Sequence, residues 1–166
     1  MNAKGRKAAA ILLAVTLTSA AGASLAASDS SFAGHYTTAS LSVQEQTAGN
    51  LLNSDRARYG LAPLVIDPEL CRIARIKSQD MRDNQYFAHT SPTYGDVRSM
   101  LRRFGYAFTA SGENIAHHAT IEQAQAAFLS SPGHRRNIMS GTYTKVGMGA
   151  AIDAQGYVYL TQIFVR

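Results

Sequence analysis

The chain has 166 residues, of which 46% are hydrophobic, and this size and composition predict one globular domain. Its formal net charge is +5, but its basic residues form no cluster interleaved with aromatic residues, which argues against nucleic acid as a partner. Because Cys71 is the only cysteine, an intramolecular disulfide is excluded, and the domain has to be stable through its hydrophobic core alone.

The N-terminal segment has the pattern of a secretory signal peptide. Lys4, Arg6 and Lys7 precede an apolar run over residues 8–17, and small residues at Ser24-Leu25-Ala26 form a signal peptidase site. The run is too short and too often interrupted for a transmembrane anchor. We therefore expect residues 1–26 to be removed on export, with Ala23 as the second candidate for the cleavage site.

Export changes the charge and the location of the protein. Loss of the three basic residues reduces the basic total from 16 to 13 against 11 acidic residues, so the net charge falls to +2. We expect a secreted, extracellular or cell-envelope-associated protein that meets the membrane only through its signal peptide before cleavage. Residues 27–43 are rich in Ser, Ala, Thr and Gly and predict a flexible spacer, which leaves 44–166 as the domain.

Two long helices are predicted at the start of the domain. The first covers residues 43–59, with Ser42 and Glu45 forming a capping box and Gly60 ending it. The second opens at Asp67-Pro68, an N-cap followed by proline at the first helical position, and ends near residue 84. Its inward stripe is Leu70, Ile73, Ala74, Lys77 and Met81, and Cys71 is interpreted as a small packing residue.

Two shorter helices and a sheet follow. Residues 96–104 and 120–130 have helical spacing, and Pro132-Gly133 is expected to end the second of these helices. Residues 145–152 and 157–165 alternate as strands around a turn at 153–156. A third strand is available at Gly112–Ala116. Both faces of the last strand are apolar, so both have to be covered, which predicts an α+β fold: an α/β/α sandwich with a small central antiparallel sheet flanked by helices.

Three side chains capable of chemistry stand in segments whose backbone is restricted by Gly or Pro. His89 lies between Phe87 and a Pro-containing turn, Glu113 lies between Gly112 and Asn114, and His134 follows Pro132-Gly133 at the end of a helix. At that place we expect the helix dipole to favour protonated His134.

The spacing of these three residues leaves several interpretations open. Two histidines and a carboxylate suit Zn²⁺ or another divalent metal with one open position, an acid/base pocket needs no metal, and three unrelated loop residues need no function. His117 and His118 are adjacent on a strand and therefore point to opposite faces, and solvent exposure is preferred for both. None of the serines stands in a Gly-x-Ser-x-Gly elbow, which disfavours a serine hydrolase.

A set of short motifs spread over the chain resembles one protein family in order and spacing: Leu52-Asn53, Arg56, Gly60-Leu61, Pro63-Leu64, Ala74, Asp80-Met81, Phe87-Ala88-His89, Ser91-Pro92, Gly112–Ala116, Ser131–Arg135, Asn137-Ile138, Gly147, Gly149, Gln162 and Phe164. The family is the CAP superfamily of cysteine-rich secretory, antigen 5 and pathogenesis-related proteins, and the chain is most similar to its bacterial SCP-like extracellular branch.

The resemblance implies a sandwich with a central cleft in which two histidines and two acids converge. His89, Glu113 and His134 match three of these four positions. At the remaining position Ser131 stands where the family has an acid, after Phe128 in the family's aromatic position. The resemblance therefore implies a cleft formed by His89, Glu113, Asn114, Ser131 and His134, with His89, His134 and Glu113 as candidate ligands of a divalent metal.

Two functions are compatible with such a cleft. The favoured hypothesis is a secreted, non-catalytic binding or signalling module whose His/Glu cleft, able to bind a divalent metal, recognises a small ligand, a lipid or a cell-envelope component with or without Zn²⁺. The alternative is a metal-dependent hydrolase of peptides or cell-wall material, in which Glu113 would be the general base and Asn114 or Ser131 would stabilise the oxyanion.

Overall fold

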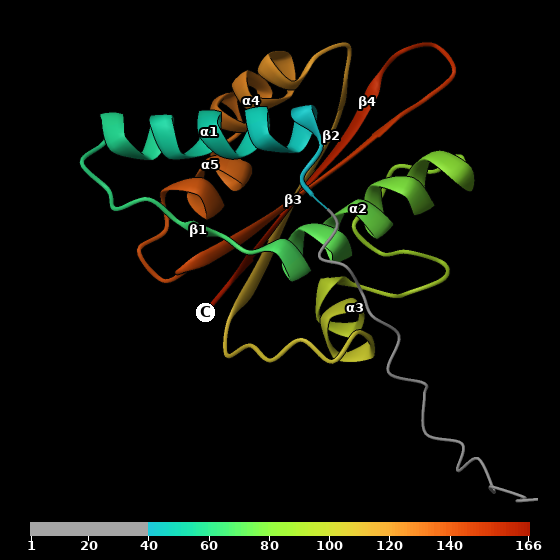
Figure 1. The fold of residues 1–166 in the computed structure, drawn as a ribbon, viewed down its shortest axis with the longest axis horizontal. Helices are drawn as coiled ribbons and strands as arrows, with labels where there is room; N and C mark the ends of the chain where they lie inside the picture. The colour runs from blue at the N-terminus through green and yellow to red at the C-terminus, as the bar shows by residue number, and fades with distance from the viewer. Residues whose placement is uncertain (1–39) are drawn as a thin grey trace, which may run out of the picture. The chain divides into compact units, whose positions relative to one another are not determined.

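The computed structural model describes residues 40–166 (Figure 1), so the predicted signal peptide and most of the predicted spacer lie outside the described residues. The elements of this part follow in the order α1 (Val43–Arg58), β1 (Val65–Ile66), α2 (Pro68–Asp83), α3 (Val97–Arg103), β2 (Ser111–His118), α4 (Ile121–Ser130), α5 (Pro132–Met139), β3 (Lys145–Ile152) and β4 (Val158–Val165). None of these helices has the length and apolar character needed to cross a membrane.

The helix starts confirm the predicted capping residues. Ser42 accepts a hydrogen bond from the Glu45 backbone N–H at 3.2 Å, and the Glu45 carboxylate accepts one from the Ser42 N–H at 2.9 Å. Asp67 caps α2 with Pro68 at the first helical position, and Asp96 caps α3. Since each such cap contributes about 1 kcal/mol, these short signals fix where the helices begin.

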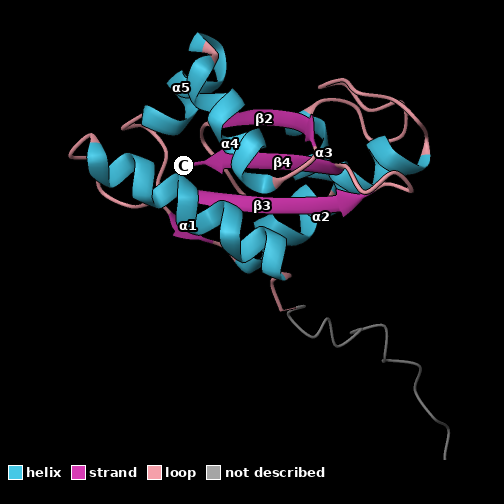
Figure 2. Cartoon of the chain, turned by 90° about the horizontal axis from the view of Figure 1, so that it is seen from above, coloured by secondary structure: helices cyan, strands magenta, loops and turns pink. Residues whose placement is uncertain are grey.

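The sheet has the strand order β1-β3-β4-β2, which leaves β2 at an edge (Figure 2). The strands β3 and β4 form the predicted antiparallel hairpin, and β2 pairs antiparallel with β4 so that Glu113 lies opposite Ile163. The two-residue strand β1, which was not predicted, adds a parallel pairing to β3. The sheet is therefore mixed, although its three long strands are antiparallel as expected.

Helices cover both faces of the sheet, which confirms the predicted sandwich. The helices α2 and α3 lie on one face, and α1, α4 and α5 lie on the other (Figure 1). Alternate residues of β4 supply both cores, as predicted: Leu160 and Phe164 pack under α1 and α4, whereas Ile163 and Val165 pack under α2 and α3. The edge strand β2 is thus contacted on one face by α3 and on the other face by α4 and α5.

Cys71 has the packing role expected of it. The side chain is buried, and its sulfur accepts a hydrogen bond from the Met148 backbone N–H at 3.2 Å. Burial raises the pKa of the Cys71 thiol to about 11, so the reactive thiolate is not formed at neutral pH.

The helix α5 is the main element that the sequence pattern did not predict. As expected, α4 ends at Ser130, just before Pro132-Gly133. However, Pro132 also occupies the first turn of a new helix, a position that proline tolerates because its missing N–H has no partner there. The prediction that His134 stands at the end of a helix was therefore wrong, because it lies in the first turn of α5.

Candidate functional site

Glu113 and His89 form a direct contact at the edge of the sheet. Glu113 lies on β2, and His89 lies in the segment between α2 and α3. His89 Nδ1 is 2.7 Å from Glu113 Oε1, and the exposed fractions of the two side chains are 57% and 3%. A buried carboxylate therefore orients an exposed imidazole, whose Nε2 makes no hydrogen bond to any described residue. We call His89, Glu113 and His134 together the edge site.

The second oxygen of Glu113 lacks a hydrogen-bond partner. Glu113 Oε2 is buried and accepts no hydrogen bond from the described residues. Leaving a buried acceptor unpaired costs about 1–3 kcal/mol, and more when it is charged. Such an atom in a folded protein calls for a partner outside the chain or for a proton. This atom is the clearest sign that the edge site serves something other than stability.

A buried lysine fixes the backbone that carries His89. Lys77 of α2 has no exposed surface, and its Nζ donates to the carbonyl oxygens of Ala88 (2.7 Å) and His89 (3.1 Å) and to the Tyr86 hydroxyl (3.2 Å). Burial lowers the pKa of Lys77, while the charges of Glu113 and Asp80 oppose that shift. The sequence pattern predicts Lys77 only as part of an inward stripe, although a lysine at a core-facing position is the signal that could have indicated this role.

Asp80 holds the same segment from the end of α2. Its carboxylate accepts hydrogen bonds from Ser91 (2.6 Å), Thr93 (3.0 Å), Asn84 (2.8 Å) and the Tyr86 hydroxyl. Burial would raise the pKa of Asp80, but these four hydrogen bonds outweigh it and hold the pKa below its ordinary value. The position of His89 is thus set by two buried charged groups of α2.

His134 approaches the edge of the sheet from the other helical layer. Its ring meets Phe128 edge-on, with 5.1 Å between centroids. Burial and then the charge of His89 lower the pKa of His134. The expectation that a helix dipole would favour protonated His134 was wrong, because the positive end of the α5 dipole opposes a second positive charge.

A chain of buried amides holds α5 against the sheet. The Asn114 side-chain amide donates to the His134 carbonyl (3.1 Å) and to Gln162 Oε1 (3.0 Å). Gln162 donates in turn to Gln125 (2.9 Å), which donates to Asp55 (2.8 Å). Asn114 has no exposed surface, and both of its amide hydrogens are engaged. Its part in the structure is therefore to position His134, and neither hydrogen is left for an oxyanion.

The other candidate residues lie outside this contact. Ser131 is the N-cap residue of α5, and its side chain makes no capping hydrogen bond. His117 is stacked on Tyr159, with 4.0 Å between ring centroids, and is hydrogen bonded to Asp153 at 2.8 Å. His118, the next residue on β2, is partly exposed.

The described residues form no preassembled metal centre at the edge site. Over residues 40–166, no group of three or more His, Cys, Asp and Glu side chains is arranged to hold an ion. His89 Nδ1 and Glu113 Oε1 face each other at hydrogen-bond distance and so occupy each other. This contact leaves His89 Nε2 and Glu113 Oε2 without partners among the described residues, and metal coordination by His89, Glu113 and His134 stays a prediction.

The lowered pKa of His134 makes stability depend on pH. Histidine in an unfolded chain binds a proton near pH 6.5, whereas folded His134 binds it only at lower pH. Between these two values the unfolded state holds more protons, so stability is full above pH 6.5 and is lost as the pH falls through this window. We expect the urea midpoint to fall less between pH 7 and pH 5 in His134→Gln than in the wild type, with His118→Gln behaving like the wild type. An NMR titration that finds His134 half-protonated at or above pH 6.5 would contradict this.

Comparison with known proteins identifies the family. The family model of the cysteine-rich secretory protein family, CAP, matches residues 50–164. The uncharacterized protein YkwD of Bacillus subtilis is 44% identical over 111 residues, which are 66% of this chain and 43% of that protein.

Solved structures of other proteins share the fold of this chain. An extracellular protein from Bacillus anthracis that contains an SCP domain has a TM-score of 0.69 at 35% identity, covering 74% of this chain and 40% of that chain. An outer surface protein of Borrelia burgdorferi shares the fold, with a TM-score of 0.67 at 17% identity over 73% of this chain and 90% of that chain. The chain spans less than half of the length of the two Bacillus relatives.

Proposed function

The chain belongs to the cysteine-rich secretory protein family, CAP, and we propose that it is an extracellular binding module that does not catalyse a reaction. Its ligand is a small polar component of the cell envelope, held at the edge site. An extracellular location is supported by the predicted signal peptide and by the Bacillus anthracis relative, which is described as extracellular.

The unpaired oxygen of Glu113 carries this proposal. A buried carboxylate oxygen without a donor can be satisfied by an N–H or O–H group of a ligand that enters beside the exposed ring of His89. His89 Nε2 offers a second polar contact on the outer edge of the same ring. A ligand rich in hydroxyl and amide groups, such as peptidoglycan, has donors of the kind that this arrangement requires.

The absence of an activated nucleophile supports binding without turnover. Nucleophilic catalysis requires a hydroxyl or thiol within hydrogen-bond reach of its base. Among the described residues, no serine, threonine or cysteine side chain is hydrogen bonded to the ring of His89 or His134. The metal-dependent alternative would require His89, Glu113 and His134 to surround one ion, and the contact between His89 and Glu113 does not favour that arrangement.

Histidine NMR spectra of the purified protein test the proposal. We expect soluble peptidoglycan fragments to shift the imidazole resonances of His89 and His134 in a saturable manner. Glu113→Gln removes the charged acceptor and should weaken binding by about tenfold or more, because a hydrogen bond to a charged group contributes about 1.5–3 kcal/mol. His118→Gln is the matched control and should bind like the wild type.

Two outcomes would overturn the proposal. One is saturable binding that Glu113→Gln leaves unchanged, which would place the ligand elsewhere. The other is Zn²⁺-dependent cleavage of the fragments that is lost in both His89→Gln and His134→Gln, which would restore the metal-dependent hydrolase alternative.

A further inference from the structure

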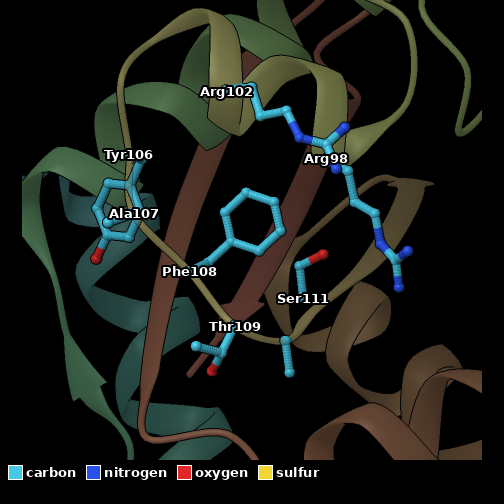
Figure 3. A pocket seen from close by; sticks show the side chains of 8 residues that line it. Arg98, Arg102, Tyr106, Ala107, Phe108, Thr109 and Ser111 are labelled. Atoms are coloured by element: carbon cyan, nitrogen blue, oxygen red, sulfur yellow. The ribbon is translucent and has the colours of Figure 1, made fainter.

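A cavity lies between α3 and the segment that leads into β2. Its volume is about 460 Å³, within the range of about 300–1,000 Å³ typical of small-molecule sites. Figure 3 shows its lining, in which two arginines of α3 extend past an aromatic ring. The residues that line it are Arg98, Arg102, Tyr106, Ala107, Phe108, Thr109, Ala110 and Ser111. None of them belongs to the edge site, so a role for this cavity is independent of the proposed function.

Two arginines at this cavity form no ion pair with any residue of the described part of the chain. Arg98 and Arg102 are exposed and stand four positions apart on α3, and neither makes an ion pair or a hydrogen bond with a described residue. The Arg102 guanidinium lies 5.9 Å from the centre of the Phe108 ring. Arg103 of the same helix, by contrast, donates to the Thr93 carbonyl at 3.3 Å. Like charges four apart on a helix are mildly destabilising, and an anion between them removes that cost.

The carboxylate on which the charges of these two arginines act is that of Asp96, and it already accepts a hydrogen bond within α3. The pKa of Asp96 is lowered, first by hydrogen bonds from Ser99 and then by the charges of Arg102 and Arg98. Asp96 is the N-cap of α3 and accepts the Ser99 backbone N–H at 2.8 Å. Its carboxylate therefore serves the start of the helix and leaves the two guanidinium groups available to a ligand.

One residue in the lining of the cavity, Ser111, has an unpaired hydroxyl. Ser111 Oγ is buried and makes no hydrogen bond within the described part of the chain. A serine hydroxyl can rotate among staggered positions about the Cα–Cβ bond, so it can donate to an acceptor placed in the cavity. An unsatisfied donor in the same lining as two available guanidinium groups is a second, independent sign of an anionic ligand.

We propose that this cavity binds the phosphate group of a phosphate ester. The guanidinium forks of Arg98 and Arg102 match phosphate oxygens, the Ser111 hydroxyl offers a further donor, and the Phe108 ring packs against the organic part of the ester. The volume of the cavity leaves room for that organic part. Either a soluble ester or a lipid headgroup carries this chemistry.

Calorimetry at low salt tests the proposal with glycerol 1-phosphate as the probe. We expect saturable binding that weakens with added salt and falls by about tenfold or more in Arg98→Gln/Arg102→Gln. The control Arg103→Gln/Arg136→Gln removes the same charge elsewhere and should change the affinity less than about twofold. Ser111→Ala should weaken binding yet leave the unliganded protein as stable or more stable, because it removes an unpaired buried hydroxyl.

Vesicles distinguish the two sources of the phosphate. Binding to phosphatidylglycerol vesicles that exceeds binding to glycerol 1-phosphate, and that is lost in Arg98→Gln/Arg102→Gln only, assigns the site to a lipid headgroup. If Arg98→Gln/Arg102→Gln loses binding of glycerol 1-phosphate but not binding to the vesicles, the site is assigned to a soluble ester. Equal losses in the two double variants, or no saturable binding of either probe, would overturn the proposal.

Discussion

Gly149→Ala is expected to destabilise the domain strongly, because it forces α2 away from β3. A Cβ atom built at Gly149 would lie 2.0 Å from the Ala74 carbonyl carbon and 2.1 Å from the Arg75 nitrogen, both of them backbone atoms of α2. A Cβ atom built at Gly147 would likewise collide with the backbone of the same helix, at Leu70 and Cys71. Backbone cannot yield as the end of a flexible side chain can, so α2 would have to move off β3, taking the supports of His89 with it.

We expect the free energy of unfolding to fall by about 3 kcal/mol or more, which is at the upper end for overpacked cores. This is a large share of the roughly 5–15 kcal/mol by which a typical domain is stable. Urea denaturation followed by circular dichroism measures it. Gly141→Ala is the matched control, because no atom lies within 4 Å of a Cβ built there and its φ is not positive. A midpoint for Gly149→Ala equal to that of Gly141→Ala would show that α2 does not lie this close to β3.

Asn114→Leu is expected to destabilise the protein by about 3 kcal/mol and to release the start of α5. Leucine has a similar volume but leaves the buried Gln162 Oε1 without its Asn114 donor, and an unpaired buried group costs about 1–3 kcal/mol. It also removes one hydrogen bond each from the partly buried His134 carbonyl and from the Asn137 amide, which keeps its bond to the Glu113 carbonyl. Because the His134 carbonyl is one of these groups, the histidine should lose its fixed position as well.

Hydrogen exchange of the α5 amides, together with urea denaturation, checks this prediction. Asn50→Leu changes an exposed asparagine that is bonded only to exposed Gln46, and it should alter stability by less than about 0.5 kcal/mol. If Asn114→Leu leaves the exchange rates of α5 unchanged, the amide chain does not hold that helix. In a double-mutant cycle, Asn114→Leu and Gln162→Leu should be strongly non-additive, because the two side chains share one hydrogen bond.

The parts of the fold that the sequence predicted are those with a local physical cause. Asp67-Pro68 and Ser42 with Glu45 specify helix starts through hydrogen bonds within one turn, and the alternation of β4 specifies two buried faces. The helix α5 was missed because Pro132 is compatible both with the end of one helix and with the start of the next. The two-residue strand β1 is too short to have a period.

In the candidate site, too, local motifs predicted the main residues, whereas contacts between distant segments were not predicted. The choice of His89, Glu113 and His134 followed from their motifs and the family resemblance, whereas the supports depend on contacts between distant segments. Lys77 donates a hydrogen bond to the carbonyl of His89, which lies twelve residues later in the sequence. Asn114 donates to Gln162, which lies opposite it on the neighbouring strand β4. Such pairings arise from the packed fold and leave no periodic trace in the sequence.

If the edge site binds an envelope component without catalysing its cleavage, that component must leave the protein chemically unchanged. Mass spectrometry of soluble peptidoglycan fragments, recovered after long incubation with the protein while the His89 resonance reports occupancy, tests this most directly. We expect full recovery of fragments with their original masses, with binding weakened in Glu113→Gln. New products that accumulate with time, at a rate lowered in Glu113→Gln, would contradict the proposed function and identify the protein as an enzyme.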